Sequence, residues 1–137
     1  MAIDPTAYFQ CQTLIHRLWN ALDHRKVDEV MACLTDDARW QREMWFEGQS
    51  AIRAALLARP KEVVIRHAFT NLIVDRDDMG FAARCLMLAQ MTKVSGDSAP
   101  PFKAPPLAVV ADLHVRIRQV DGEWKAHEIS FDPVFQN

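Results

Sequence analysis

The chain has 137 residues, of which 50% are apolar and 25% are charged, and its formal charge at pH 7 is −2. This length and composition are typical of a globular chain with a packed core, so we expect one domain over residues 1–137 rather than a disordered protein. The near-neutral charge and the lack of a long Lys/Arg cluster argue against a nucleic-acid partner.

The sequence also argues against a membrane or secreted protein. Its apolar runs end well before the roughly 18 residues that a membrane-spanning helix needs. The segment from Met1 to Pro5 lacks the basic and apolar regions of a signal peptide. Cys11, Cys33 and Cys85 are odd in number and widely spaced, which favours reduced thiols in the core. We therefore expect a cytoplasmic protein.

Three helices are expected in the first half of the chain. The first begins after Asp4-Pro5, a good N-cap followed by proline at the first helical position. Its apolar residues recur at helical spacing: Tyr8, Cys11, Leu14, Ile15, Leu18, Trp19 and Leu22. The second carries Val27, Val30, Met31 and Leu34 and ends at Asp36-Asp37. After a short strand over residues 38–41, the third follows Gly48-Gln49-Ser50 and ends at Pro60.

The second half of the chain is rich in β-forming residues. Long strands are predicted over residues 63–75, 81–94, 107–120 and 123–131. Residues 77–80 and Asp121-Gly122 are hairpin turns, whereas residues 95–106 form a longer, proline-rich connection. The order of elements predicts an α+β fold in which three N-terminal helices pack on a strongly curved antiparallel sheet.

Asp23 is the first candidate for a functional residue. It follows Trp19 by four residues and Ile15 by eight, so helical geometry places it on the stripe that faces the core. Burial and the helix dipole both oppose a carboxylate in the last turn of a helix. We therefore expect Asp23 to have a partner; the alternative is that it caps the backbone amides of Arg25 and Lys26.

Four motifs, in this order, resemble the SnoaL-like branch of the nuclear transport factor-like, or cystatin-like, superfamily, and the resemblance covers nearly the whole chain. They are Ala21-Leu22-Asp23, Leu34-Thr35-Asp36-Asp37-Ala38-Arg39-Trp40, Gly48-Gln49-Ser50-Ala51-Ile52 and Arg66-His67-Ala68-Phe69-Thr70-Asn71-Leu72. The resemblance implies a cone-shaped α+β barrel with a pocket between the helices and the concave face of the sheet. It also implies a homodimer formed through the outer sheet face.

His67 is the second candidate, and its role comes from the resemblance. Dehydratases and a dehydrohalogenase of this superfamily have an Asp late in the first helix and a His on the first long strand. This chain resembles them in having Asp23 and His67 at those positions. The resemblance implies that the carboxylate orients the ring and that His67 removes a proton from the substrate. The alternative is an ordinary core histidine. Both faces of residues 63–75 are largely apolar, so the strand pattern leaves the direction of His67 open.

Aromatic residues are candidates for the wall of a pocket that binds an apolar small molecule. Such a pocket could be lined by Trp40, Trp45, Phe46, Phe69 and Tyr8, although aromatic residues at these spacings are also typical of a plain core. Trp45 and Phe46 are expected in an irregular stretch at the pocket mouth.

Two further positions bear on the pocket. His127 alternates with Ile129 and Phe131, so it is a candidate second polar group facing an apolar pocket. Dehydratase-like members often carry Tyr or Lys five residues before the helical Asp. Here that position is Leu18, which could contribute apolar contact to a substrate but no hydrogen bond.

Two functions are compatible with these residues. The first is a cofactor-free lyase (dehydratase) or isomerase that acts on an apolar cyclic molecule. The second is a non-catalytic ligand-binding or assembly module resembling the small subunit of aromatic-ring dioxygenases, which the apolar Leu18 favours. No metal or cofactor is expected, because the sequence has no phosphate-binding glycine loop, His-Glu-x-x-His or Cys-x-x-Cys. An open cavity that contains His67 would support the enzyme, and a filled cone would support the module.

Overall fold

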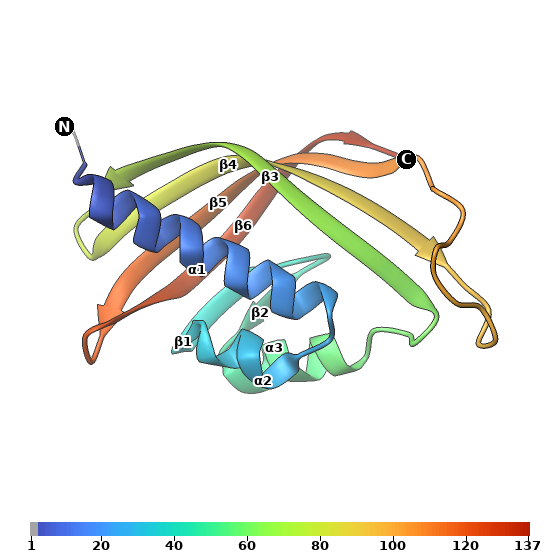
Figure 1. The fold of residues 1–137 in the computed structure, drawn as a ribbon. Coiled ribbons are helices and arrows are strands. Elements are labelled where there is room, and N and C mark those ends of the chain that lie inside the picture. Colours follow the sequence, from blue (N-terminus) through green and yellow to red (C-terminus); the bar gives the residue numbers. More distant parts are fainter. Residues whose placement is uncertain (1–2) are drawn as a thin grey trace.

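The structure is a computed structural model that describes residues 3–137. It contains the helices α1 (Pro5–Asp23), α2 (Val27–Ala32) and α3 (Gln49–Leu57). Its strands are β1 (Leu34–Gln41), β2 (Trp45–Glu47), β3 (Val63–Arg76), β4 (Gly80–Lys93), β5 (Leu107–Val120) and β6 (Glu123–Gln136). The helices lie on the concave side of one curved sheet, with α1 running across it and α2 and α3 beside its shorter strands (Figure 1). The α+β class expected from the sequence is confirmed.

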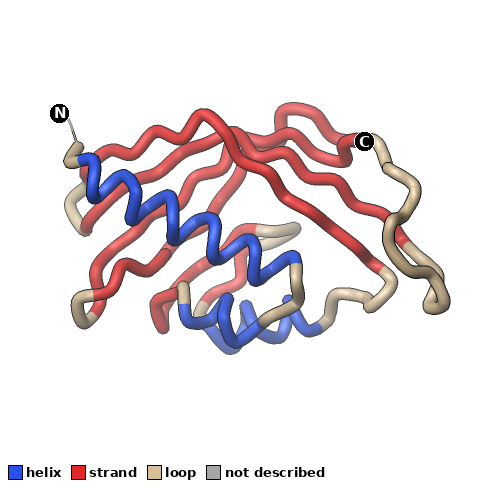
Figure 2. Tube along the Cα trace, viewed as in Figure 1, coloured by secondary structure: helices blue, strands red, loops and turns tan. Residues whose placement is uncertain are grey.

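The sheet is open rather than closed into a full barrel. Its strand order is β2-β1-β6-β5-β4-β3, so β2 and β3 are its two edges within residues 3–137. Neighbouring strands are antiparallel except β1 and β6, which run parallel. The long strands arch over the helices, and the cone is left open on one side (Figure 2).

Helix α1 forms as the sequence predicts. The Asp4 carboxylate accepts a hydrogen bond from the Thr6 amide at 2.8 Å, and Pro5 occupies the first turn. The apolar stripe is buried against the sheet, including Leu18 and Trp19, and it continues to Asp23 at the last position of the helix. Among the described helices, none is both long enough and apolar enough to cross a membrane.

The second helix is shorter than predicted, and the first strand is longer. Helix α2 ends at Ala32, and Leu34 begins β1 instead of closing the helix. Strand β6 causes this change, because Leu34 pairs with Ala126 and the Ala126 amide donates to the Cys33 carbonyl at 2.9 Å. Pairing within the sheet has overridden a helical pattern that local sequence alone favoured.

The region between β1 and α3 also differs from the prediction. Trp45 and Phe46 belong to strand β2, which pairs with Gln41 and Trp40 of β1 in a short hairpin. The segment is therefore ordered by main-chain hydrogen bonds rather than irregular.

Strand β6 extends further than the sequence predicts. It continues to Gln136 instead of ending at Phe131, although Pro133 lies within it. Pro133 is opposite Ala111 where the register with β5 shifts, and this irregularity accommodates a residue that has no amide hydrogen.

Bulges give the sheet its curvature. In β3 the register shifts between Thr70 and Ile73, and Asn71 adopts a positive φ of 59° there. In β6 the register shifts opposite Arg116 and Ile117, which leaves His127 as an extra residue between Ala126 and Glu128. A bulge bends a strand and increases its twist, so both sites help the sheet wrap around the helices.

The core lies between α1 and the concave face of the sheet. Alternate residues of the long strands face inward, as Cys85, Leu113 and Ile129 do. Cys11 and Cys85 are buried free thiols, and burial raises the pKa of each to about 11. Both are therefore protonated core residues at neutral pH.

Candidate active site

A cavity of about 870 Å³ opens between α1, the end of α3 and the concave face of the sheet. This volume falls in the range of small-molecule sites. Its apolar walls include Trp19 and Leu22 from α1, and Trp40 and Phe46 from β1 and β2. Further apolar wall residues come from the long strands: Val63, Ile65, Met87, Ala89, Met91, Val109, Leu113, Phe131 and Pro133. The polar side chains at the wall are Gln41, Arg42, Glu43, Arg59, His67 and Gln136.

Asp23 and His67 form a pair at this cavity. The ring nitrogen Nδ1 of His67 lies 2.6 Å from Oδ1 of Asp23, and the backbone amide of His67 donates to Oδ2 at 2.8 Å. Both side chains are largely buried, with exposed fractions of 9% for His67 and 5% for Asp23. The Asp23 carboxylate thus receives a hydrogen bond on each oxygen, which satisfies the need for a partner that its buried position creates.

The end of α1 directs the Asp23 side chain toward β3. The backbone amides of Arg25 and Lys26 bond to the carbonyls of Leu22 and Ala21, at 3.2 and 2.9 Å. These amides are therefore already satisfied by the main chain. The alternative in which the Asp23 carboxylate caps them is wrong.

The His67 ring is fixed by packing as well as by Asp23. Val63, Ile65 and His67 all line the cavity, so this half of β3 presents these alternate residues to the concave face. The ring stacks on Phe69 with centroids 6.4 Å apart and planes 9° apart, and Phe69 in turn packs edge-on against Trp19 at 5.1 Å. These contacts leave the ring little freedom to turn away from Asp23.

The two nitrogens of the His67 ring have different surroundings. A carboxylate oxygen can only accept a hydrogen bond, so Nδ1 carries the hydrogen in the neutral ring. Within residues 3–137, Nε2 has no hydrogen-bond partner. The pair therefore presents the free lone pair of Nε2 as its available proton acceptor.

The other candidate residues separate into two groups. Trp40 and Phe46 line the cavity, whereas Leu18, Trp45 and Phe69 do not. Leu18 is fully buried in the core. Trp45 is covered by the guanidinium of Arg39, 4.0 Å from its ring, and Phe69 stands behind His67 as a packing residue.

His127 does not face the cavity, contrary to the sequence expectation. The bulge in β6 interrupts the alternation with Ile129 and Phe131 on which that expectation depended. Burial lowers the pKa of His127, and the charges of Arg118 and Arg116 on β5 lower it further. Its Nε2 atom is buried without a hydrogen-bond partner in the described structure.

Among the cavity residues that were not candidates from the sequence are two arginines: Arg42, which follows β1, and Arg59, which follows α3. Each belongs to a turn, where side-chain direction has no periodic signal. Burial lowers the pKa of Arg59, the nearby Arg25 lowers it further, and the charge of Asp23 acts in the opposite direction. The wall of the cavity therefore carries two guanidinium groups.

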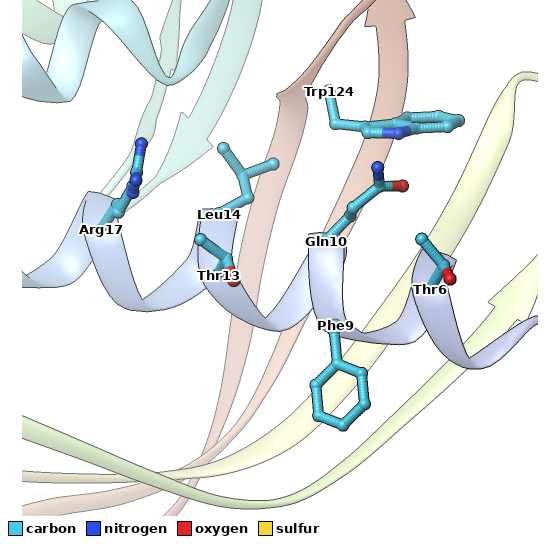
Figure 3. Close-up of a pocket in the computed structure, with 7 residues that line it drawn as sticks. All are labelled: Thr6, Phe9, Gln10, Thr13, Leu14, Arg17 and Trp124. Atoms are coloured by element: carbon cyan, nitrogen blue, oxygen red, sulfur yellow. The ribbon is translucent and has the colours of Figure 1, made fainter.

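A second hollow, of about 440 Å³, is lined by side chains of α1 and by Trp124 of β6 (Figure 3). Thr6, Gln10 and Leu14 form part of its wall, and Arg17 is its one ionisable side chain among the described lining residues. It offers no acid-base pair, so it is not the candidate site. Within the described range of the chain, no group of three or more His, Cys, Asp or Glu side chains could hold a metal ion.

Comparisons with known proteins agree with this architecture. The sequence profile of the SnoaL-like domain matches residues 6–130. No curated protein matches the sequence.

Solved structures with the same fold are distant in sequence. A protein with a cystatin-like fold from Nostoc punctiforme superposes with a TM-score of 0.77 at 16% identity, covering 97% of this chain and 95% of that one. ActVI-ORFA from Streptomyces coelicolor gives 0.78 at 18% identity, covering 93% and 97%. A candidate scytalone dehydratase from Novosphingobium aromaticivorans gives 0.76 at 16% identity, covering 92% and 83%. At these identities the likeness establishes the shared fold.

Proposed function

Because the chain belongs to the SnoaL-like domain family, we propose that it binds a small molecule in its cavity and acts on it as a cofactor-free lyase or isomerase. The substrate we propose is an apolar, cyclic compound with an acidic carbon-bound proton. The observation that carries this proposal is the hydrogen-bonded pair of Asp23 and His67 at the wall of an open, largely apolar cavity.

The chemistry follows from the two nitrogens of His67. Nε2 takes the proton from a carbon next to a carbonyl, and the electron pair of that C–H bond moves into an enolate. The Asp23 carboxylate, 2.6 Å from Nδ1, stabilises the imidazolium that forms. An isomerase would return this proton to another carbon, whereas a dehydratase would give it to a departing hydroxyl group to form water.

The environment of the pair supports base catalysis. Both side chains are shielded from solvent, and the surrounding wall is mainly aliphatic and aromatic. Low dielectric strengthens the attraction between Asp23 and the imidazolium at the moment the proton is transferred. Stacking on Phe69 keeps the ring oriented, so no reorganisation of His67 is needed during the reaction.

The alternative is a ligand-binding or assembly module without catalysis. Leu18 favours it, since this fully buried side chain offers no hydrogen bond at a position where dehydratase-like relatives often carry Tyr or Lys. The open cavity favours the enzyme, because a module that worked only by assembly would have no need of an accessible site. A ligand that binds without any proton exchange would support the alternative.

Deuterium exchange tests the proposal directly. The bicyclic ketones 1-tetralone and 2-tetralone, incubated in D₂O with and without the protein, are followed by proton NMR at the carbon next to the carbonyl. We expect the protein to accelerate this exchange. The protein-catalysed rate should be about 10²- to 10⁴-fold lower with His67→Gln, since this is the usual contribution of a general base.

His114→Gln is the matched control, because His114 is a half-buried histidine that pairs with Asp132 at 3.3 Å and does not line the cavity. It should exchange protons as fast as the unmodified protein. Ketones that bind, as seen by quenching of tryptophan fluorescence, but exchange no faster than in buffer would contradict catalysis and favour the module.

A further inference from the structure

Two arginines of the cavity wall have no acidic partner. Arg42 and Arg59 both line the cavity, and neither forms an ion pair with a carboxylate within the described structure. Arginines elsewhere do form such pairs: Arg39, Arg53, Arg84, Arg116 and Arg118. Other arginines also lack such a pair, but Arg42 and Arg59 are the arginines among the described residues that line this cavity, so their guanidinium groups are available to a ligand there.

Neighbouring charges leave this wall electropositive. Arg25, Arg42 and Arg66 all act on Arg59, and Asp23 is the carboxylate that opposes them. Asp23, however, already receives hydrogen bonds from His67 on both oxygens. The remaining acid of the cavity wall is Glu43, which is exposed and forms no ion pair in the described part of the chain.

Arg59 is held in place but retains free donors. One Nη atom donates to the Leu22 carbonyl at 3.2 Å, which anchors the guanidinium beside the end of α1. A guanidinium has five N–H donors in a planar fork, so most of the donors of Arg59 remain available. This geometry matches the two oxygens of a carboxylate.

We propose that the ligand of this cavity carries a carboxylate on its apolar cyclic body, and that Arg59 and Arg42 bind this group. The inference rests on the proposed ligand-binding function and specifies the substrate class. A monoanion suits the site better than a phosphate, because two cations stand in a mainly apolar wall that has neither a glycine-rich loop nor a helix N-terminus among its lining residues. Arg42 and Arg59 are thus specificity residues.

A pair of probes that differ only in charge tests the inference. The binding of 2-naphthoate and of its neutral isostere 2-naphthamide is measured by calorimetry and by the fluorescence of Trp19 and Trp40, which line the cavity. We expect the acid to bind about tenfold or more tightly, as for other charge-assisted hydrogen bonds. Arg59→Gln and Arg42→Gln should each reduce this preference, and the double variant should abolish it.

Arg84→Gln is the control, because Arg84 forms an exposed ion pair with Asp75 outside the cavity and its loss should leave the preference unchanged. We expect Arg42→Gln to fold normally, because the Arg42 side chain forms no hydrogen bond to the rest of the described structure. Thermal unfolding measures whether each variant is folded. If the acid binds no better than the amide, or if its advantage persists in the double variant, the inference is overturned.

The binding test remains informative if catalysis fails. The same two probes are measured on His67→Gln, which lacks the proposed base but keeps both arginines. An acid preference in that variant supports the arginine site even if deuterium exchange shows no catalysis. Conversely, exchange that depends on His67 without any acid preference would keep the catalytic proposal and remove this one.

Discussion

Two histidines of the sheet, His67 and His127, differ in what surrounds their ring nitrogens. His67 has the Asp23 carboxylate 2.6 Å from Nδ1, as a hydrogen-bond partner. His127 has the cations Arg116 and Arg118 nearby and a buried Nε2 without a partner in the described structure, which oppose protonation. The same residue type therefore has a carboxylate partner at the cavity and cationic neighbours in the bulge of β6.

The lowered pKa of His127 predicts that acid destabilises the fold. Below its ordinary pKa of about 6.5, the unfolded chain takes up a proton at His127 that the folded protein binds less readily, so the free energy of unfolding falls as pH falls. We expect His127→Gln to lose less stability than the unmodified protein between about pH 7.5 and pH 5.5. Urea unfolding at the two pH values measures this difference.

The comparison at pH 7.5 separates the two effects of the substitution. Any loss of packing lowers stability at both pH values, whereas proton linkage changes only the slope between them. Identical slopes for the two proteins would contradict the proposed environment of His127.

At the scale of elements, the turn between α1 and α2 is bonded to residues that line the cavity. Arg25 follows α1 with a positive φ of 60°, and its guanidinium donates to the carbonyls of Arg59, Pro60 and Val63 at 3.3, 2.6 and 2.7 Å. Arg59 and Pro60 lie between α3 and β3, and Val63 is the first residue of β3. One side chain therefore joins the end of α1, which carries Asp23, to the start of β3, which carries His67.

We predict that Arg25→Ala lowers the free energy of unfolding by about 1 to 2 kcal/mol, because it removes charge-assisted hydrogen bonds that are partly open to solvent. Alanine keeps the Cβ atom, so the backbone cost of the positive φ stays the same. Urea unfolding provides the measurement.

Arg53→Ala is the control for that experiment. Arg53 pairs with Asp28 on the surface, at 2.7 Å, and such pairs usually contribute less than about 1 kcal/mol. If Arg25→Ala costs no more than Arg53→Ala, the connection through Arg25 does not stabilise the fold.

At the scale of the whole molecule, the outer face of the sheet carries an apolar row that nothing in the described chain covers. Ala68 pairs with Leu88, Leu88 with Val110, and Val110 with Phe135, so four strands contribute neighbouring apolar side chains. Leu88 lies between Met87 and Ala89, which line the cavity on the other face. Phe135 is 70% exposed in the single chain. Apolar surface of this kind is typical of an interface.

We predict that a second copy of this chain covers the row, so that the protein is a homodimer through its outer sheet face. Size-exclusion chromatography with light scattering should give twice the mass of one chain. Leu88→Glu should shift the protein to the monomer, because it buries a charge in the interface. Leu57→Glu, at a 66% exposed position on α3, should remain dimeric. A monomeric unmodified protein would contradict the prediction.

The sequence by itself determined the features that depend on local periodicity and capping. Asp4-Pro5 and the apolar stripe of α1 predicted that helix and the inward position of Asp23, and β5 begins and ends where the sequence placed it. Hairpin signals at residues 77–80 and 121–122 lie at the observed turns, where Asp121 and Gly122 both have positive φ. Each of these features is set by residues a few positions apart.

Only the tertiary structure decided what depends on contacts between distant segments. Leu34 was expected in a helix but lies in a strand, because it pairs with β6. His127 was expected to face the cavity but does not, because a bulge in β6 changes the alternation there. The direction of His67 was also undecided, because both faces of β3 are apolar in sequence. Arg42 and Arg59 stand in turns that carry no periodic signal, so their meeting at one cavity required the folded chain. Sequence periodicity reports which face of an element is buried, whereas sheet register and the packing of α1 against β3 decide which side chains share a site.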